Sequence, residues 1–134
     1  MNKKHVLWAA LWLAASVGQA KVELTHLTVE GRVAPVGMDV MKPRFGWQIL
    51  SDRKNVLQKS YQILVASTRE KIECGEGDVW NSGIVKSDSS QWVALPGTIQ
   101  LRPGQAYYWK ARVTTNRGTT AWSPVATWST GLLT

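Results

Sequence analysis

The segment Ala106–Thr115 constrains the fold most, because its side chains alternate between two chemical classes for ten residues. Its apolar side carries Tyr107, Trp109, Ala111 and Val113, and its more polar side carries Tyr108, Lys110, Arg112 and Thr114. A period of two residues indicates a half-buried β-strand, because successive side chains of a strand point to opposite faces. The apolar face of such a strand must be covered, so the pattern predicts a second layer packed against it.

Other short segments rich in Val, Ile, Thr, Trp and Tyr are separated by turn residues, and these are also expected to be strands. We expect them at Val22–Val29, Arg44–Leu50, Ser60–Ser67, Gln91–Leu95 and Thr120–Leu132, with a hairpin-like stretch at Val79–Ser87 that bends at Asn81-Ser82-Gly83. The sequence therefore predicts an all-β chain, a β-sandwich of about seven strands.

Two of these elements have special features. Ser60–Ser67 is apolar on both faces, which predicts a central strand covered on both sides. The only helix expected is Thr68–Cys74, with Ser67 or Thr68 as the N-cap and Gly75 at its end.

Length and composition exclude several classes of protein. With 134 residues the chain holds one domain and is too short for a barrel enzyme of about 250 residues. Its 44% hydrophobic and 19% charged residues indicate a globular chain rather than a disordered one. A single Cys cannot form a disulfide within the chain, so stability must come from burial.

The first twenty residues have the pattern of a secretory signal peptide. A basic start at Lys3 and Lys4 is followed by an apolar run over Val6–Val17 and by small residues before a cleavage point after Ala20. The run is shorter than the roughly 20 residues that a membrane-spanning helix needs, which disfavours a retained anchor. We expect residues 1–20 to be a signal peptide and residues 21–134 a mature β-sandwich, exported to the periplasm or the medium and free of the membrane.

Cleavage would leave 14 basic and 9 acidic residues, a net charge of +5, and six of the eight Trp. The basic residues are scattered, with no run longer than two. This pattern argues against a nucleic-acid partner.

The run Leu101–Tyr107 (LRPGQAY) has the spacing of a tyrosine corner, in which a Tyr hydroxyl bonds back to nearby backbone. With Trp47 on the second strand, Tyr61 on the third and no paired cysteines, the chain resembles a fibronectin type III or immunoglobulin-like module. The residues expected to be structural are Trp47, Tyr61, Leu101, Pro103, Tyr107 and Trp109.

A more specific resemblance rests on five motifs in order: PRFGWQ at 43–48, KSYQILVAST at 59–68, GDVWNSGIVKSDSS at 77–90, LRPGQAYYWKARV at 101–113 and AWSPVATWSTGLL at 121–133. This series resembles the N-terminal β-sandwich of bacterial alpha-L-rhamnosidases, a group of glycoside hydrolases. Two departures are mild, since Asn81 stands where that family usually has Asp and Trp128 where Phe is common.

The resemblance implies a parent enzyme several times longer, in which a helical-barrel domain hydrolyses terminal alpha-L-rhamnosides. None of those catalytic residues can be assigned here. We therefore expect a non-catalytic accessory module, as a fragment, a truncated form or a stand-alone copy, whose partners are the catalytic and other domains of a parent hydrolase. The alternatives are a carbohydrate-binding module for a rhamnose-containing glycan and a general protein-interaction module.

The residues themselves offer little chemistry. Glycoside hydrolysis needs two carboxyl groups facing across one cleft, whereas the cluster Glu73, Glu76 and Asp78 is expected to be a solvated acidic patch, with calcium binding as the alternative. In the expected mature chain, His26 and Cys74 are the only His and Cys, and they fall on separate elements. A zinc site needs three or four ligands, so these two are too few. No catalytic, cofactor-binding or metal-binding residue is expected.

Tryptophan residues are the remaining functional candidates. We expect Trp47 and Trp109 to fill the core, and Trp80, Trp92, Trp122 and Trp128 to lie near strand ends. There they would cover the surface that docks on a neighbouring domain or, as the alternative, stack on sugar rings.

Overall fold

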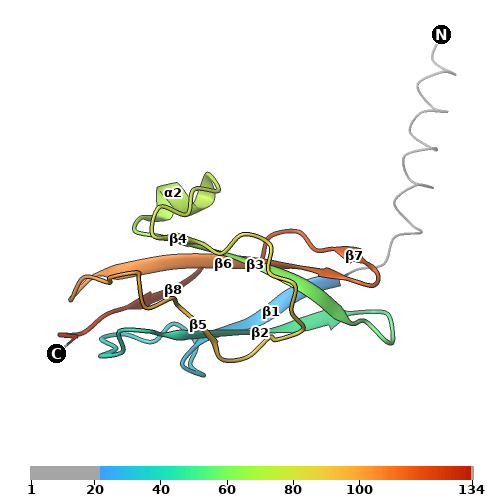
Figure 1. The fold of residues 1–134 in the computed structure, drawn as a ribbon, viewed down its shortest axis with the longest axis horizontal. Coiled ribbons are helices and arrows are strands. Elements are labelled where there is room, and N and C mark those ends of the chain that lie inside the picture. Colours follow the sequence, from blue (N-terminus) through green and yellow to red (C-terminus); the bar gives the residue numbers. More distant parts are fainter. Residues whose placement is uncertain (1–21, 134) are drawn as a thin grey trace, which may run out of the picture.

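The structure is a computed structural model that describes residues 22–133, so the expected signal peptide at residues 1–20 lies outside the described residues. Two antiparallel sheets face each other and enclose the core (Figure 1). This arrangement confirms the predicted immunoglobulin-like β-sandwich with very little helix.

The smaller sheet has three strands in the order β1 (Val22–Val29), β2 (Arg44–Ser51) and β5 (Val93–Ala94). The pairing of β1 with β2 shifts register between Thr25 and Thr28. Such a bulge bends the strand locally and increases its twist.

The larger sheet has five strands in the order β4 (Trp80–Asn81), β3 (Gln58–Ala66), β6 (Ala106–Thr115) and β7 (Gly118–Thr119), with β8 (Ala126–Ser129) also paired to β6. β7 pairs with the end of β6, and β8 pairs with its beginning. β6 is therefore the strand around which this sheet is built.

The strands expected at Val22–Val29 and Ala106–Thr115 have the observed bounds of β1 and β6. The expected strand Thr120–Leu132 is wrong in extent, since only β8 forms there. Thr120 and Ser123 use their hydroxyls to accept hydrogen bonds from the N–H groups of Val113 (3.1 Å) and Ala111 (3.0 Å). The backbone N–H groups of the same two residues donate to the carbonyls of Val113 and Ala111, so between β7 and β8 hydroxyls take only the acceptor half of the ladder.

The hairpin-like stretch expected at 79–87 is reduced to β4 and an isolated bridge between Tyr61 and Val85. Asn81 accounts for the bend, because its side-chain oxygen accepts a hydrogen bond from the N–H of Gly83 at 2.9 Å. Gly83 has a φ of +64°, which is readily adopted only by glycine.

The single described helix, α2 (Arg69–Glu73), covers part of the outer face of β3 (Figure 1). Thr68 is its N-cap and accepts a hydrogen bond from the N–H of Lys71. Ile72 is buried against Leu64 and Ala66 of β3. β3 is thus covered on both faces over this part, as its two-sided apolar pattern predicts.

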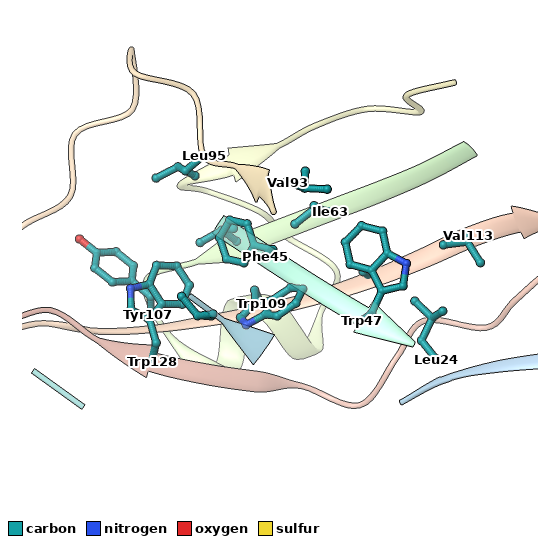
Figure 2. Close-up of a cluster of buried hydrophobic side chains, with 13 residues drawn as sticks. Leu24, Phe45, Trp47, Ile63, Val93, Leu95, Tyr107, Trp109, Val113 and Trp128 are labelled. Atoms are coloured by element: carbon teal, nitrogen blue, oxygen red, sulfur yellow. The ribbon is translucent and has the colours of Figure 1, made fainter. Parts of the chain in front are cut away.

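Phe45 lies in the centre of the core, between the two sheets (Figure 2). Its ring centroid is 4.7 Å from that of Trp109 and 5.5 Å from that of Trp128. Trp47 is fully buried as well, and its indole N–H donates to the side chain of Gln58 at 3.0 Å. Large aromatic rings from both sheets therefore meet in the core.

The predicted tyrosine corner is present. The backbone N–H of Arg102 donates to the hydroxyl of Tyr107 at 2.7 Å, and the Tyr107 ring stacks on Trp128 at 5.1 Å. Leu101 packs against the core, whereas Pro103 is exposed in the turn before Gly104.

Replacing Tyr107 with Phe should test this corner. The ring stack on Trp128 is kept, but the N–H of Arg102 loses its acceptor, so we expect the free energy of unfolding to fall by about 1 kcal/mol in urea denaturation. Tyr108→Phe is the matched control, because that hydroxyl has no hydrogen bond among the described residues. Equal effects of both substitutions would contradict a structural role for the corner.

Candidate functional site

The four candidate Trp residues lie in four different environments. Trp128 is 1% exposed and belongs to the core, so its expected place at a docking or sugar-binding surface is wrong. The physical reason is register: β8 pairs Trp128 with Tyr107, whose ring it stacks on inside the sandwich. Trp80 is half-buried and stacks on Phe45 with centroids 6.2 Å apart, which places it at the edge of the core.

Trp92 is the most exposed of the four, at 56%. It precedes β5 and has a φ of +58°, an uncommon backbone conformation for a bulky residue. The guanidinium of Arg44 lies 4.5 Å from the centroid of its ring. Trp92 is thus an exposed ring with a cation over it.

Arg44 is itself held by Glu30. The Nε and Nη2 atoms of Arg44 each donate to a different carboxylate oxygen of Glu30 at 2.9 Å, and the backbone N–H of Arg44 donates at 2.8 Å. Hydrogen bonds from the Arg44 side chain are the main cause that lowers the pKa of Glu30, although partial burial acts in the opposite direction. The ion pair therefore fixes the cation that lies over Trp92.

Trp122 is half-buried on the outer face of the larger sheet, beside two cations. The Arg112 guanidinium lies 4.5 Å and the Lys110 ammonium 5.3 Å from the ring centroid. Trp122 is thus a half-buried ring within a cationic surface.

A groove at the C-terminal end of the sandwich was not expected from the sequence, and we call it the exit groove. It has a volume of about 360 Å³ and is lined by Met41, Lys42, Gly97, Ile99, Gln100, Leu101, Pro103, Leu132 and Leu133. Met41 is 62% and Leu132 is 76% exposed, so apolar side chains face solvent here. The only signal in the sequence is the apolar pair Leu132-Leu133 after a glycine.

The last described residues are fixed beside this groove. A carboxylate oxygen of Asp39 accepts a hydrogen bond from the N–H of Leu132 at 2.7 Å. Gly131 donates to the carbonyl of Met38 at 2.8 Å, and a Cβ at position 131 would collide with the Asp39 carboxylate. Residues 131 and 132 are therefore held on the body of the domain at its C-terminal end (Figure 1).

The residues considered for chemistry are not brought together. Cys74 is an exposed free thiol at the end of α2, and His26 is exposed on β1. Among residues 22–133, no group of three or more His, Cys, Asp and Glu side chains could hold a metal ion. No helix in the same range is long and apolar enough to span a membrane.

Asp78 in the expected acidic patch has a structural role. Its carboxylate accepts hydrogen bonds from the N–H and the hydroxyl of Ser67 at 2.9 and 2.6 Å, and from the Lys71 ammonium at 3.3 Å. Burial disfavours the charged form, but these hydrogen bonds outweigh it and lower the pKa of Asp78. Asp78 thereby ties the end of β3 to α2 and the loop after it.

Residues 24–134 match the family described as Rha78A-like, N-terminal immunoglobulin domain. The chain belongs to this family. An alpha-L-rhamnosidase of Streptomyces avermitilis is 35% identical over 113 residues, which are 84% of this chain and 11% of that enzyme. An alpha-L-rhamnosidase of Alteromonas sp. (strain LOR) is 35% identical over 106 residues, which are 78% of this chain and 11% of that enzyme.

Solved structures show the same relationship. The crystal structure of the Streptomyces avermitilis alpha-L-rhamnosidase complexed with L-rhamnose matches with a TM-score of 0.78 and 35% identity, over 84% of this chain and 11% of that one. The alpha-L-rhamnosidase from Dictyoglumus thermophilum also matches with a TM-score of 0.78, at 33% identity, over 83% and 12% of the two chains.

The chain thus spans about a tenth of the length of its relatives. The matched part is their N-terminal immunoglobulin domain and not their catalytic domain. These residues therefore correspond to a non-catalytic accessory module, and the predicted resemblance to the N-terminal module of rhamnosidases is confirmed.

The ion pair between Glu30 and Arg44 predicts a pH dependence of stability. Because the folded state lowers the pKa of Glu30 below its usual value of about 4.5, the stabilisation is fully present above that pH. It is lost as the pH falls through the lowered pKa. In urea denaturation from pH 7 to pH 3, Glu30→Gln should be less stable than the wild type at pH 7, and the difference should shrink below pH 4.5.

Arg44→Gln should reproduce this convergence at low pH, because it removes the partner that lowers the pKa of Glu30. A difference between wild type and Glu30→Gln that stays constant down to pH 3 would contradict the assignment.

Proposed function

We propose that the chain is the N-terminal accessory module of an exported alpha-L-rhamnosidase-like glycoside hydrolase, and that it packs on the neighbouring domain through the exit groove. Membership of the N-terminal immunoglobulin family is the observation that carries this proposal. In the relatives about nine-tenths of the enzyme lies outside the matched segment.

The exit groove supports this docking surface on physical grounds. Its exposed side chains Met41 and Leu132 belong to a patch that water solvates poorly, and burial of apolar area is the main favourable term in domain association. Asp39 holds the chain where it leaves the domain, so a domain that follows would start beside the groove. The cores of interfaces between domains are depleted in charged residues, so uncharged Met and Leu side chains suit such a contact.

Export to the periplasm or the medium is part of the proposal. It is supported by the basic start, the apolar run and the small residues before Ala20. After cleavage the proposed mature protein begins at Lys21, next to the first residue of β1.

A hybrid enzyme tests the docking surface. This chain would replace the matching segment of the Streptomyces avermitilis alpha-L-rhamnosidase, and thermal unfolding and hydrolysis of an aryl alpha-L-rhamnoside would be measured. Leu132→Asp should lower the Tm of the hybrid by several degrees, because it buries a charge in the contact. The same substitution should leave the Tm of the isolated chain, which has no hydrolytic activity, nearly unchanged.

Leu57→Asp is the matched control. Leu57 is 64% exposed and follows the turn between β2 and β3, at the opposite end of the sandwich (Figure 1). It should change neither protein. A hybrid whose Tm is insensitive to Leu132→Asp, or equally sensitive to both substitutions, would contradict docking through the exit groove.

A second candidate function is binding of a rhamnose-containing glycan at Trp92. The specific observation in its favour is an exposed ring, 56% accessible, with Arg44 held over it by Glu30. A fixed aromatic ring can stack on the apolar face of a sugar with little loss of conformational freedom. Titration with rhamnose-containing oligosaccharides should then quench Trp fluorescence in the wild type but not in Trp92→Ala. Flat titrations up to millimolar sugar would contradict this function.

A further inference from the structure

The outer face of the larger sheet carries a cluster that the docking proposal does not use, and we call it the outer-face cluster: Lys110, Arg112 and Trp122. Lys110 and Arg112 are two residues apart on β6, so both side chains point away from the core. Both cationic groups lie beside the Trp122 ring, at 5.3 and 4.5 Å from its centroid. α2 covers a neighbouring part of this face, over Leu64 and Ala66.

The cluster holds positive charge without a matching carboxylate. The ion pairs of Arg44 with Glu30, Arg69 with Glu73 and Lys71 with Asp78 do not reach the cluster. Lys110 is only 8% exposed, with no hydrogen bond or ion pair from its ammonium to the described residues. The Lys110 stem is therefore covered while its ammonium still reaches solvent, where it can pair with an anion from outside.

Arg112 is fixed in one orientation by neutral groups. Its Nε and Nη2 atoms donate to the side-chain oxygen of Gln62 at 3.2 and 3.0 Å. Gln62 in turn donates to the side-chain oxygen of Asn81 at 3.0 Å. This leaves the Nη1 donors without a partner among residues 22–133. A guanidinium held in this way is preorganised to bind a carboxylate from outside.

A shallow groove of about 230 Å³ adjoins Arg112, and its lining includes Ser60, Gln62, Ile84, Thr114 and Thr119. The hydroxyls of Thr114 and Thr119 share one hydrogen bond at 3.0 Å, so the pair still has a proton to donate and lone pairs to accept. Hydroxyl and amide groups therefore lie next to a fixed cation. The volume of the groove is smaller than the roughly 300 Å³ at which drug-sized pockets begin.

We propose that the outer-face cluster and this groove bind a glycan that contains uronic acids. Lys110 and Arg112 hold the sugar carboxylate, and the groove hydroxyls and Gln62 bond to the sugar hydroxyls. The cations already lie over the Trp122 ring, so recognition rests on charge and hydrogen bonds rather than on stacking. The net charge of +5 expected after cleavage favours approach of a polyanion.

The lining favours a glycan over an acidic protein surface. Lys and Ser are depleted in the cores of protein–protein interfaces, whereas Ser60 lines this groove with two Thr and a Gln, and Lys110 lies in the adjoining cluster. The proposal is independent of docking through the exit groove, because the two surfaces share no residue. Failure of one leaves the other intact.

The test is isothermal titration of the full chain with trigalacturonic acid, a short uronic-acid oligomer, with maltotriose as the neutral sugar and a glutamate trimer as the acidic peptide. We expect saturable binding of trigalacturonic acid, with an affinity that falls as the salt concentration rises. We expect no binding of maltotriose or of the glutamate trimer. Arg112→Gln and Lys110→Met, which keeps the buried stem, should each weaken binding by about tenfold, the loss expected for one charge-assisted hydrogen bond.

Arg32→Gln is the matched control, because it removes the same charge from an exposed loop at the other sheet. It should change the affinity less than about twofold. Near-UV circular dichroism would show that each variant keeps its packed aromatic core. Three results would each overturn the proposal: no binding at millimolar trigalacturonic acid, an equal loss in Arg32→Gln, or equal binding of the glutamate trimer.

Discussion

The structure depends on the packing of Phe45 between the two sheets. Phe45 comes from β2 of the smaller sheet and contacts Trp109 and Trp128 of the larger one, at 4.7 and 5.5 Å between ring centroids. The indole N–H groups of both Trp residues are buried without a hydrogen-bond partner among the described residues. Each such group costs about 1–3 kcal/mol, whereas burying a Trp side chain of roughly 200 Å² contributes about 5 kcal/mol. Burial therefore outweighs the missing hydrogen bonds.

Much of the fold could be predicted because its signals are local. The period of two in β6 predicted its bounds and its buried face, and the two-sided apolar pattern of β3 predicted a strand covered on both sides. The buried positions of Trp47 and Trp109 followed from the same alternation. Trp128 was misplaced because its strand is only four residues long, and its burial is decided by pairing with Tyr107 rather than by local pattern.

The candidate surfaces could not be predicted, because each is assembled from segments far apart in the sequence. The exit groove combines Met41 with Ile99 and Leu132, and no local pattern relates these three positions. In the outer-face cluster, the outward positions of Lys110 and Arg112 follow from strand alternation. The place of Trp122 does not, because Thr120 and Ser123 hold its segment on β6 with hydroxyl as well as backbone hydrogen bonds, outside a regular strand.

The central claim is that the accessory module docks through the end at which its chain leaves the sandwich. Hydrogen–deuterium exchange tests it most directly, by comparing the amides of the isolated chain with those of the same chain joined to a rhamnosidase body. The account predicts slower exchange in the joined protein at residues 41–42, 97–103 and 131–133, and unchanged exchange in the turn at residues 52–57. Unchanged exchange around the exit groove, or protection confined to another face, would contradict the account.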